Sequence, residues 1–134
     1  MELYYGSDKL MFLLIIILVV FILLNKRKSQ KNIQQNNNLI NSILSNNTEV
    51  VIKNLESRKY GVHSKAKSGE SALELAILKD NKYMVAYLIK YGALPNPKEL
   101  KTAIKCKNEE IIHVVRTGKY QKIILEYKLL KKNS

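Results

Sequence analysis

The residues most informative about the fold are 69–97, which read GESALELAILKDNKYMVAYLIKYGALPNP. The polar pair Asp80-Asn81 predicts a turn between two short helices, because Asp and Asn favour turns over helix interiors. Ala76, in the first helix, is small enough to allow a neighbouring helix to pack closely. One face of the second helix is apolar and is formed by Met84, Val85, Leu88 and Ile89. The stretch therefore predicts a two-helix unit.

The end of this unit is marked by glycine and proline. Gly92 is expected to end the second helix as a left-handed cap. Pro95 and Pro97 are expected to prevent the helix from restarting, so that Pro95-Asn96-Pro97 forms a tight turn.

The pattern recurs on both sides of this unit. Residues 42–51 match residues 76–85 at an offset of 34, and residues 103–112 match the same block at an offset of 27. Small, apolar and Asn positions coincide in these alignments. Self-similarity near this period is typical of stacked two-helix units.

Residues 66–97 closely resemble an ankyrin repeat. The matching positions are Gly69, Leu73, Ala76, Val85, Leu88, Gly92, Ala93 and Asn96. Glu74 stands where the family has a histidine that links neighbouring repeats, Asp80 replaces the usual turn glycine, and Leu94 replaces the usual Asp. The resemblance implies an all-α stack of about three repeats, at 39–65, 66–97 and 98–118; the alternative is an unrelated small helical bundle.

A final amphipathic helix is predicted within residues 119–134, whose apolar positions are Tyr120, Ile123, Ile124, Tyr127 and Leu130. Its lysines favour a capping helix with a solvated polar face. A basic surface for lipid or nucleic acid is the other interpretation.

Near the N-terminus, residues 10–24 are fifteen consecutive apolar residues, preceded by a short segment, 1–9. As a helix they extend about 22 Å, against a hydrocarbon core of about 30 Å. Lys9 and Lys26 can snorkel, and Tyr4 and Tyr5 suit an interface. A cleaved signal peptide and a buried core helix are alternatives. We favour a permanent transmembrane signal anchor, because the segment is apolar all round and lacks a small-residue cleavage site.

The charges that flank this segment predict its orientation. Lys26, Arg27, Lys28 and Lys31 follow it, whereas Lys9 is offset by acidic residues on the other side. The positive-inside rule places the C-terminal part in the cytoplasm and the N-terminus outside. These four residues are also expected to attract anionic lipid head groups. Residues 25–38 are rich in Asn and Gln and predict a flexible tether.

The sequence gives little support to catalysis, and we expect no cofactor. One Cys and two His do not predict a metal cluster, and the five Gly form no phosphate-binding loop. Glu109 and Glu110 are expected to open a helix, where the helix dipole favours acidic residues. Cys106 and His113 are separated by a predicted turn, which argues against a thiol–imidazole dyad.

The net charge of +12 raises the alternative of a basic protein that binds a membrane surface or nucleic acid. Residues 25–134 hold 22 basic and 9 acidic residues, a net charge of +13. Nucleic acid is disfavoured because Arg, which dominates base readout, is scarce and aromatic residues are not interleaved.

The ankyrin resemblance implies a non-enzymatic, membrane-tethered protein that binds a protein partner. The partner-binding residues that it implies are Lys67, Ser68, Glu70, Leu78, Lys79 and Tyr91. Scaffolding, host interaction and toxin neutralisation all remain open as roles.

Overall fold

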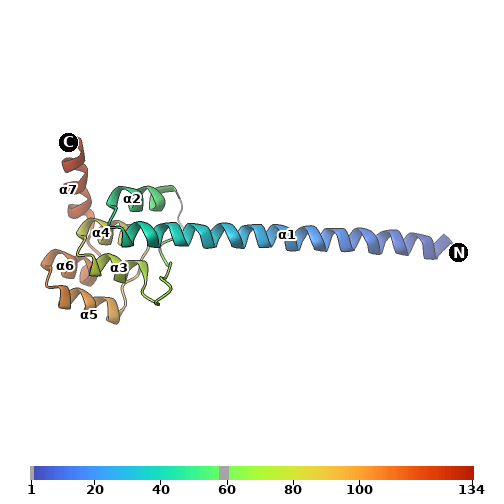
Figure 1. The fold of residues 1–134 in the computed structure, drawn as a ribbon, viewed down its shortest axis with the longest axis horizontal. Coiled ribbons are helices and arrows are strands. Elements are labelled where there is room, and N and C mark those ends of the chain that lie inside the picture. The colour runs from blue at the N-terminus through green and yellow to red at the C-terminus, as the bar shows by residue number, and fades with distance from the viewer. Residues whose placement is uncertain (1, 58–60) are drawn as a thin grey trace. The chain divides into compact units, whose positions relative to one another are not determined.

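The computed structural model describes residues 2–57 and 61–134, with backbone alone for 2–5, 32, 35 and 36. Every secondary-structure element of the described residues is a helix, apart from one isolated β-bridge between Lys65 and Ser71, so the all-α prediction is confirmed (Figure 1). The helices are α1 (Glu2–Leu44), α2 (Thr48–Ser57), α3 (Ala72–Leu78), α4 (Lys82–Lys90), α5 (Pro97–Cys106), α6 (Glu109–Thr117) and α7 (Gln121–Lys132). The chain divides into two compact units, 1–34 and 35–134, which we describe separately.

The first unit consists of the N-terminal part of α1. In the described part of the chain, one helical segment, Gly6–Lys31, is by length and composition able to cross a membrane, and none of it is buried. Its 26 residues extend about 39 Å, which exceeds the hydrocarbon thickness of about 30 Å. The residues on both sides of the apolar run 10–24 are therefore also helical, and they lengthen the helix beyond the thickness of the hydrocarbon core. The side chains of Tyr4 and Tyr5, expected at an interface, lie outside the described residues.

The predicted flexible tether at 25–38 is helical instead, because α1 continues to Leu44. Two features of the sequence explain the difference. Neither Gly nor Pro occurs between Gly6 and Gly61, so nothing in this stretch forces the helix to end. Lys, Arg and Gln, which recur along 26–35, are good helix formers despite their polarity. Low hydrophobicity correctly indicated that these residues do not build a core, but it did not indicate coil.

The second unit contains the predicted two-helix pairs: the last turns of α1 with α2, α3 with α4, and α5 with α6. A residue with positive φ ends the first helix of each pair, at Asn46, Asp80 and Lys107. These three residues are separated by 34 and 27 positions, which are the offsets found in the sequence. The repeat is therefore also a repeat of backbone conformation.

An Asn residue caps the second helix of each pair. The side-chain oxygens of Asn47, Asn81 and Asn108 accept from the backbone N–H three residues later, at 3.2, 3.1 and 3.3 Å. Such a cap satisfies a helix N-terminal donor that otherwise lacks a partner. The Asn positions that coincide in the sequence alignments are thus the helix caps.

One core runs through the pairs, and the apolar face predicted for α4 is part of it. Met84, Val85 and Leu88 are fully buried, and Ile89 packs against them partly exposed. Ala76 and Ala103 are also fully buried, as expected for positions where helices approach closely. Gly92 has a φ of +105° just after α4, which confirms its predicted role in ending the helix.

The prediction that Pro97 prevents a helix was wrong, because Pro97 is the first residue of α5. Asn96 caps this helix, and Glu99 completes a capping box by accepting from the Asn96 N–H at 2.9 Å. Proline is favoured at the first helical position, where a missing N–H costs nothing. The connection between the second and third pairs is therefore short because a new helix starts at once.

Helix α7 packs against α4, in the middle pair, and its placement differs from that of a simple end cap (Figure 1). Ile123 and Ile124 are buried as predicted, and the Tyr127 ring lies 5.1 Å from that of Tyr83. Leu130, which was expected on the buried face, is exposed. The last helix is therefore fastened to the second helices of the pairs.

Candidate protein-binding edge

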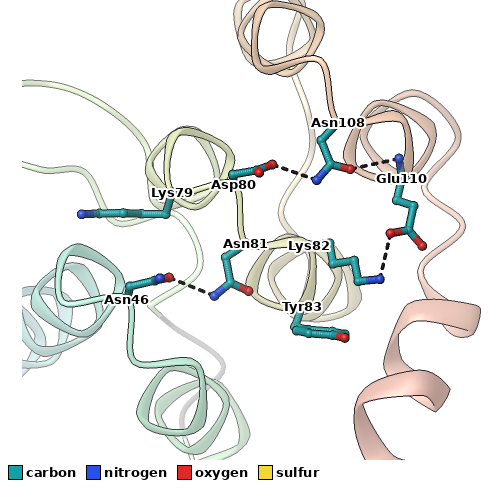
Figure 2. Close-up of a pocket in the computed structure, with 8 residues that line it drawn as sticks. All are labelled: Asn46, Lys79, Asp80, Asn81, Lys82, Tyr83, Asn108 and Glu110. Carbon is teal, nitrogen blue, oxygen red and sulfur yellow. Dashed lines mark hydrogen bonds and ion pairs between the residues drawn. The ribbon is translucent and has the colours of Figure 1, made fainter. Parts of the chain in front are cut away.

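The turns inside the helix pairs line up along one edge of the second unit. We call this the turn edge and define it by residues 44–48, 78–82 and 104–109. Asn81 Nδ2 donates to Asn46 Oδ1 at 2.9 Å and to Thr48 Oγ1 at 2.8 Å, and so joins the first two turns. Asn108 Nδ2 donates to Asp80 Oδ1 at 2.8 Å and joins the second turn to the third (Figure 2). These bonds fix the register of the three pairs.

A polar hollow of about 330 Å³ lies along this edge (Figure 2). Its lining residues are Asn46, Lys79, Asp80, Asn81, Lys82, Tyr83, Asn108 and Glu110. Within it, Lys82 Nζ bonds to Glu110 at 2.8 Å and to Glu126 of α7 at 2.9 Å. The Tyr83 hydroxyl also donates to Glu126, at 2.9 Å. The hollow is therefore held by charge pairs that connect α4, α6 and α7.

These contacts shift the pKa values of the groups involved. The hydrogen bonds that Lys82 donates to Glu110 and then to Glu126 raise the pKa of Lys82 well above its usual range. The hydrogen bond from Lys82, followed by that from Tyr83, lowers the pKa of Glu126. At neutral pH both groups are charged, and the cluster acts as a structural clamp.

Exposed apolar side chains stand along the same edge. Leu44, Leu78 and Ile104 lie in the last turn of the first helix of each pair and are 45%, 54% and 49% exposed. Exposed lysines surround them at Lys79, Lys105 and Lys107, and among the described residues none of the three forms an ion pair. In Figure 2 the Lys79 side chain points away from the paired groups. The turn edge thus presents leucine and isoleucine beside uncompensated positive charge.

The opposite ends of α3 and α5 are joined by a different set of bonds. The Ser71 hydroxyl, which caps α3 by accepting from Glu74 N at 3.0 Å, donates to the Glu99 carboxylate of the next pair. Glu74 is buried and pairs with Lys98 Nζ at 3.0 Å. Glu74 therefore connects the second helix pair to the third through an ion pair with Lys98.

The six residues that the ankyrin resemblance implied do not form one cluster. Lys67, Ser68 and Glu70 lie in the loop before α3, where the Ser68 hydroxyl bonds to Glu70 and lowers the pKa of its carboxyl. Leu78 and Lys79 lie at the turn edge, at the other end of α3. This helix of seven residues separates the two groups by about 10 Å.

Tyr91, the sixth residue, is half-buried at the end of α4 and packs against the core. Lys90 Nζ lies 5.2 Å from the centre of its ring, and burial raises the pKa of its hydroxyl. Its contacts are those of a packing residue as much as of a binding residue.

Leu44 and Ile104 belong to the turn edge but were not predicted from the sequence. The 34-residue offset places Leu44 directly under Leu78, so this alignment was a usable signal. Ile104 falls under Ile77, which is fully buried. It is exposed in the third pair because, among the described residues, no further helix pair packs against it, and the sequence alignment does not carry that information.

The residues considered for catalysis lie on α5 and α6. Glu109 and Glu110 lie in the first turn of α6, as predicted. Cys106 is half-buried at the end of α5, and His113 is exposed on α6. No three metal-ligating side chains gather within residues 2–57 and 61–134.

The basic residues that follow the apolar run of α1 are Lys26, Arg27, Lys28 and Lys31, and all four are exposed.

Compared with protein families, curated proteins and solved structures, the chain shows no match.

Proposed function

We propose that this chain is a single-pass membrane protein whose second unit is an ankyrin-like stack of helix pairs that binds a protein partner, without catalysis. The observation that carries the proposal is the turn edge. Exposed apolar side chains occur there in the last turn of the first helix of each pair, with Leu44 and Leu78 at equivalent positions and Ile104 one position earlier, and a ladder of Asn and Asp side chains holds the turns in register. A rigid, repeated apolar row beside a polar rim is the anatomy of a recognition surface.

The charge distribution supports a partner of acidic character. Four carboxylates of the second unit form ion pairs with lysines within the fold, and Asp80 accepts a hydrogen bond in the turn ladder; the four are Glu49, Glu74, Glu110 and Glu126. Lys79, Lys105 and Lys107 at the turn edge keep their charge exposed. An acidic segment with apolar side chains would complement both features, and the exposed charge would speed its association.

The anchor is supported by the exposed apolar helix and by the charges beside it. A water-soluble helix of this length would be expected to bury an apolar stripe, and none of Gly6–Lys31 is buried. Lys26, Arg27, Lys28 and Lys31 support an orientation with the second unit in the cytoplasm and anionic lipid near the helix end.

Affinity capture of the intact protein from native membranes tests the binding function. The test variant carries Leu78→Ala and Lys79→Ala, and the matched control carries Leu94→Ala and Lys53→Ala, which change exposed residues away from the turn edge. A protein captured with the parent and the control, but lost from the test variant, supports the proposal. Equal capture by all three contradicts the turn edge as the site.

The alternative is a basic protein that acts mainly through its net charge of +12. Nucleic acid that is released by moderate salt, and bound equally by both variants, would favour it, because such binding depends on total charge and on salt.

A further inference from the structure

Helix α7 has one side that is fixed to the rest of the second unit. Ile123 and Ile124 are buried, and the Tyr127 ring lies between those of Tyr83 and Tyr87, at 5.1 and 6.0 Å. The Glu126 carboxylate accepts from Lys82 and Tyr83, and Lys131 pairs with Glu49 of α2. These contacts determine the rotation of α7 about its axis.

That rotation turns two leucines outward. Leu125 and Leu129 are four residues apart, so they lie on the same face of the helix. They are 59% and 53% exposed. Three exposed lysines, Lys122, Lys128 and Lys132, flank them and form no ion pair with any described residue. We call these five residues the outer α7 face.

We propose that the outer α7 face docks onto an anionic lipid bilayer, in the plane of its head groups. A helix side with leucines at its centre and lysines at its borders is the pattern of helices that lie in a membrane interface. The leucines enter the acyl boundary, and the lysines meet the phosphate and carboxylate groups of anionic lipids. This inference rests on the proposed membrane anchor.

The anchor explains how so small a face can act. Two leucines and three lysines would bind a membrane weakly from solution. A unit anchored to the same bilayer through α1 binds it in an intramolecular step, so the anchor raises the effective concentration of the face at the membrane. Docking then holds the second unit at the surface in a chosen orientation.

The charges of the face argue against other occupants. A second copy docking face to face would oppose three lysines to three lysines, and bringing like charges together costs energy. Nucleic acid would use the lysines but leave the leucines in water.

The experiment uses the full chain in lipid nanodiscs, made with phosphatidylcholine alone or with added phosphatidylserine. A bimane probe is attached at Leu129→Cys in a Cys106→Ala background, and a lipid-borne quencher reports contact with the bilayer. We expect strong quenching with phosphatidylserine and weak quenching without it. The variant Lys122→Gln, Lys128→Gln, Lys132→Gln should lower the ratio of docked to free states about a hundredfold, at roughly fivefold per lysine. The control Lys53→Gln, Lys65→Gln, Lys101→Gln removes the same charge elsewhere and should leave quenching unchanged.

A second variant, Leu125→Ser, should also reduce quenching and tests the apolar contribution. Co-elution of the protein with nanodiscs separates this inference from the anchor. Co-elution with quenching that ignores phosphatidylserine, or that falls equally in the control, overturns the docking face alone. Quenching that falls as the number of protein copies per nanodisc rises, and that ignores phosphatidylserine, assigns the face to a second copy and overturns it too. Failure to co-elute overturns the anchor and this inference together.

Discussion

The N-terminal part of α1 and the helix pairs of the second unit are both helical, but their side chains are arranged for different surroundings. Residues 10–24 are apolar on every side, and none of the helix around them is buried. In α6, the apolar residues Ile111, Ile112, Val114 and Val115 fall on one face and are buried, whereas every other residue of the helix is exposed. The comparison shows that helix formation alone does not determine what surrounds a helix. The angular distribution of its apolar residues does.

The largest effect is expected from charges placed in the apolar helix. Replacing Ile17 and Leu18 with Arg should remove the protein from the membrane fraction, because each Arg at the centre of a bilayer costs about 3 kcal/mol on insertion scales. Membrane fractionation with carbonate washing measures this. Replacing the exposed apolar residues Val50 and Leu94 of the second unit with Arg adds the same charge and should leave membrane association intact. Retention of the Ile17→Arg, Leu18→Arg variant in the washed membrane would contradict a bilayer-spanning role.

The next effect concerns the core of the helix pairs. Leu88→Ala should destabilise the second unit by about 3 to 4 kcal/mol, because Leu88 is fully buried and its removal leaves a cavity. Leu94→Ala should change stability by less than about 0.5 kcal/mol, since Leu94 is 82% exposed. Urea unfolding followed by circular dichroism measures both in detergent. Equal effects at the two positions would contradict the core described here.

Much of the second unit could be predicted because its determinants are local. Gly92 marks the end of a helix, and the recurrence of Asn47, Asn81 and Asn108 at offsets of 34 and 27 predicted the pairs. The errors share one cause, which is that the outcome depended on a neighbouring element. Pro97 stops one helix and starts the next, and only the capping contacts of Asn96 and Glu99 decide between these roles.

The turn edge could likewise be predicted only in part. Leu78 and Lys79 were implied as partner-binding residues by the ankyrin resemblance. The exposure of Ile104 could not be predicted, because it depends on which of the described elements pack beside the third pair. The position of α7 on α4 depends on long-range contacts, such as Tyr83 with Tyr127 and Lys82 with Glu126, that the amphipathic pattern does not specify. The pattern in α7 gave the face that is buried, but not the partner that buries it.

A smaller effect is expected at the ladder between the turns. Asn81→Ala removes the cap on α4 and the bonds to Asn46 and Thr48. It should cost about 1 to 2 kcal/mol, which is the upper part of the range for a helix cap. Asn47→Ala is a matched variant, because it removes a cap with a single bond to Val50. Urea unfolding should rank Asn81→Ala as the more damaging change, and the opposite order would show that the ladder does not couple the pairs.

The smallest expected effect is a pH dependence of the packing of α7 against α4. The pKa of Glu126 is lowered in the folded state, chiefly by the hydrogen bond from Lys82. Its contribution to stability is therefore present above the unfolded pKa of about 4.3 and is lost as the pH falls through the lower folded value. Glu126→Gln should remove this part of the acid sensitivity and leave stability at neutral pH only slightly reduced, because the carboxylate is partly exposed and screened by solvent. The fluorescence of the neighbouring Tyr83 and Tyr127 rings reports whether α7 remains packed against α4. If the parent and Glu126→Gln show the same acid transition, then the apolar contacts of Ile123 and Ile124, and not the charge clamp, hold α7 in place.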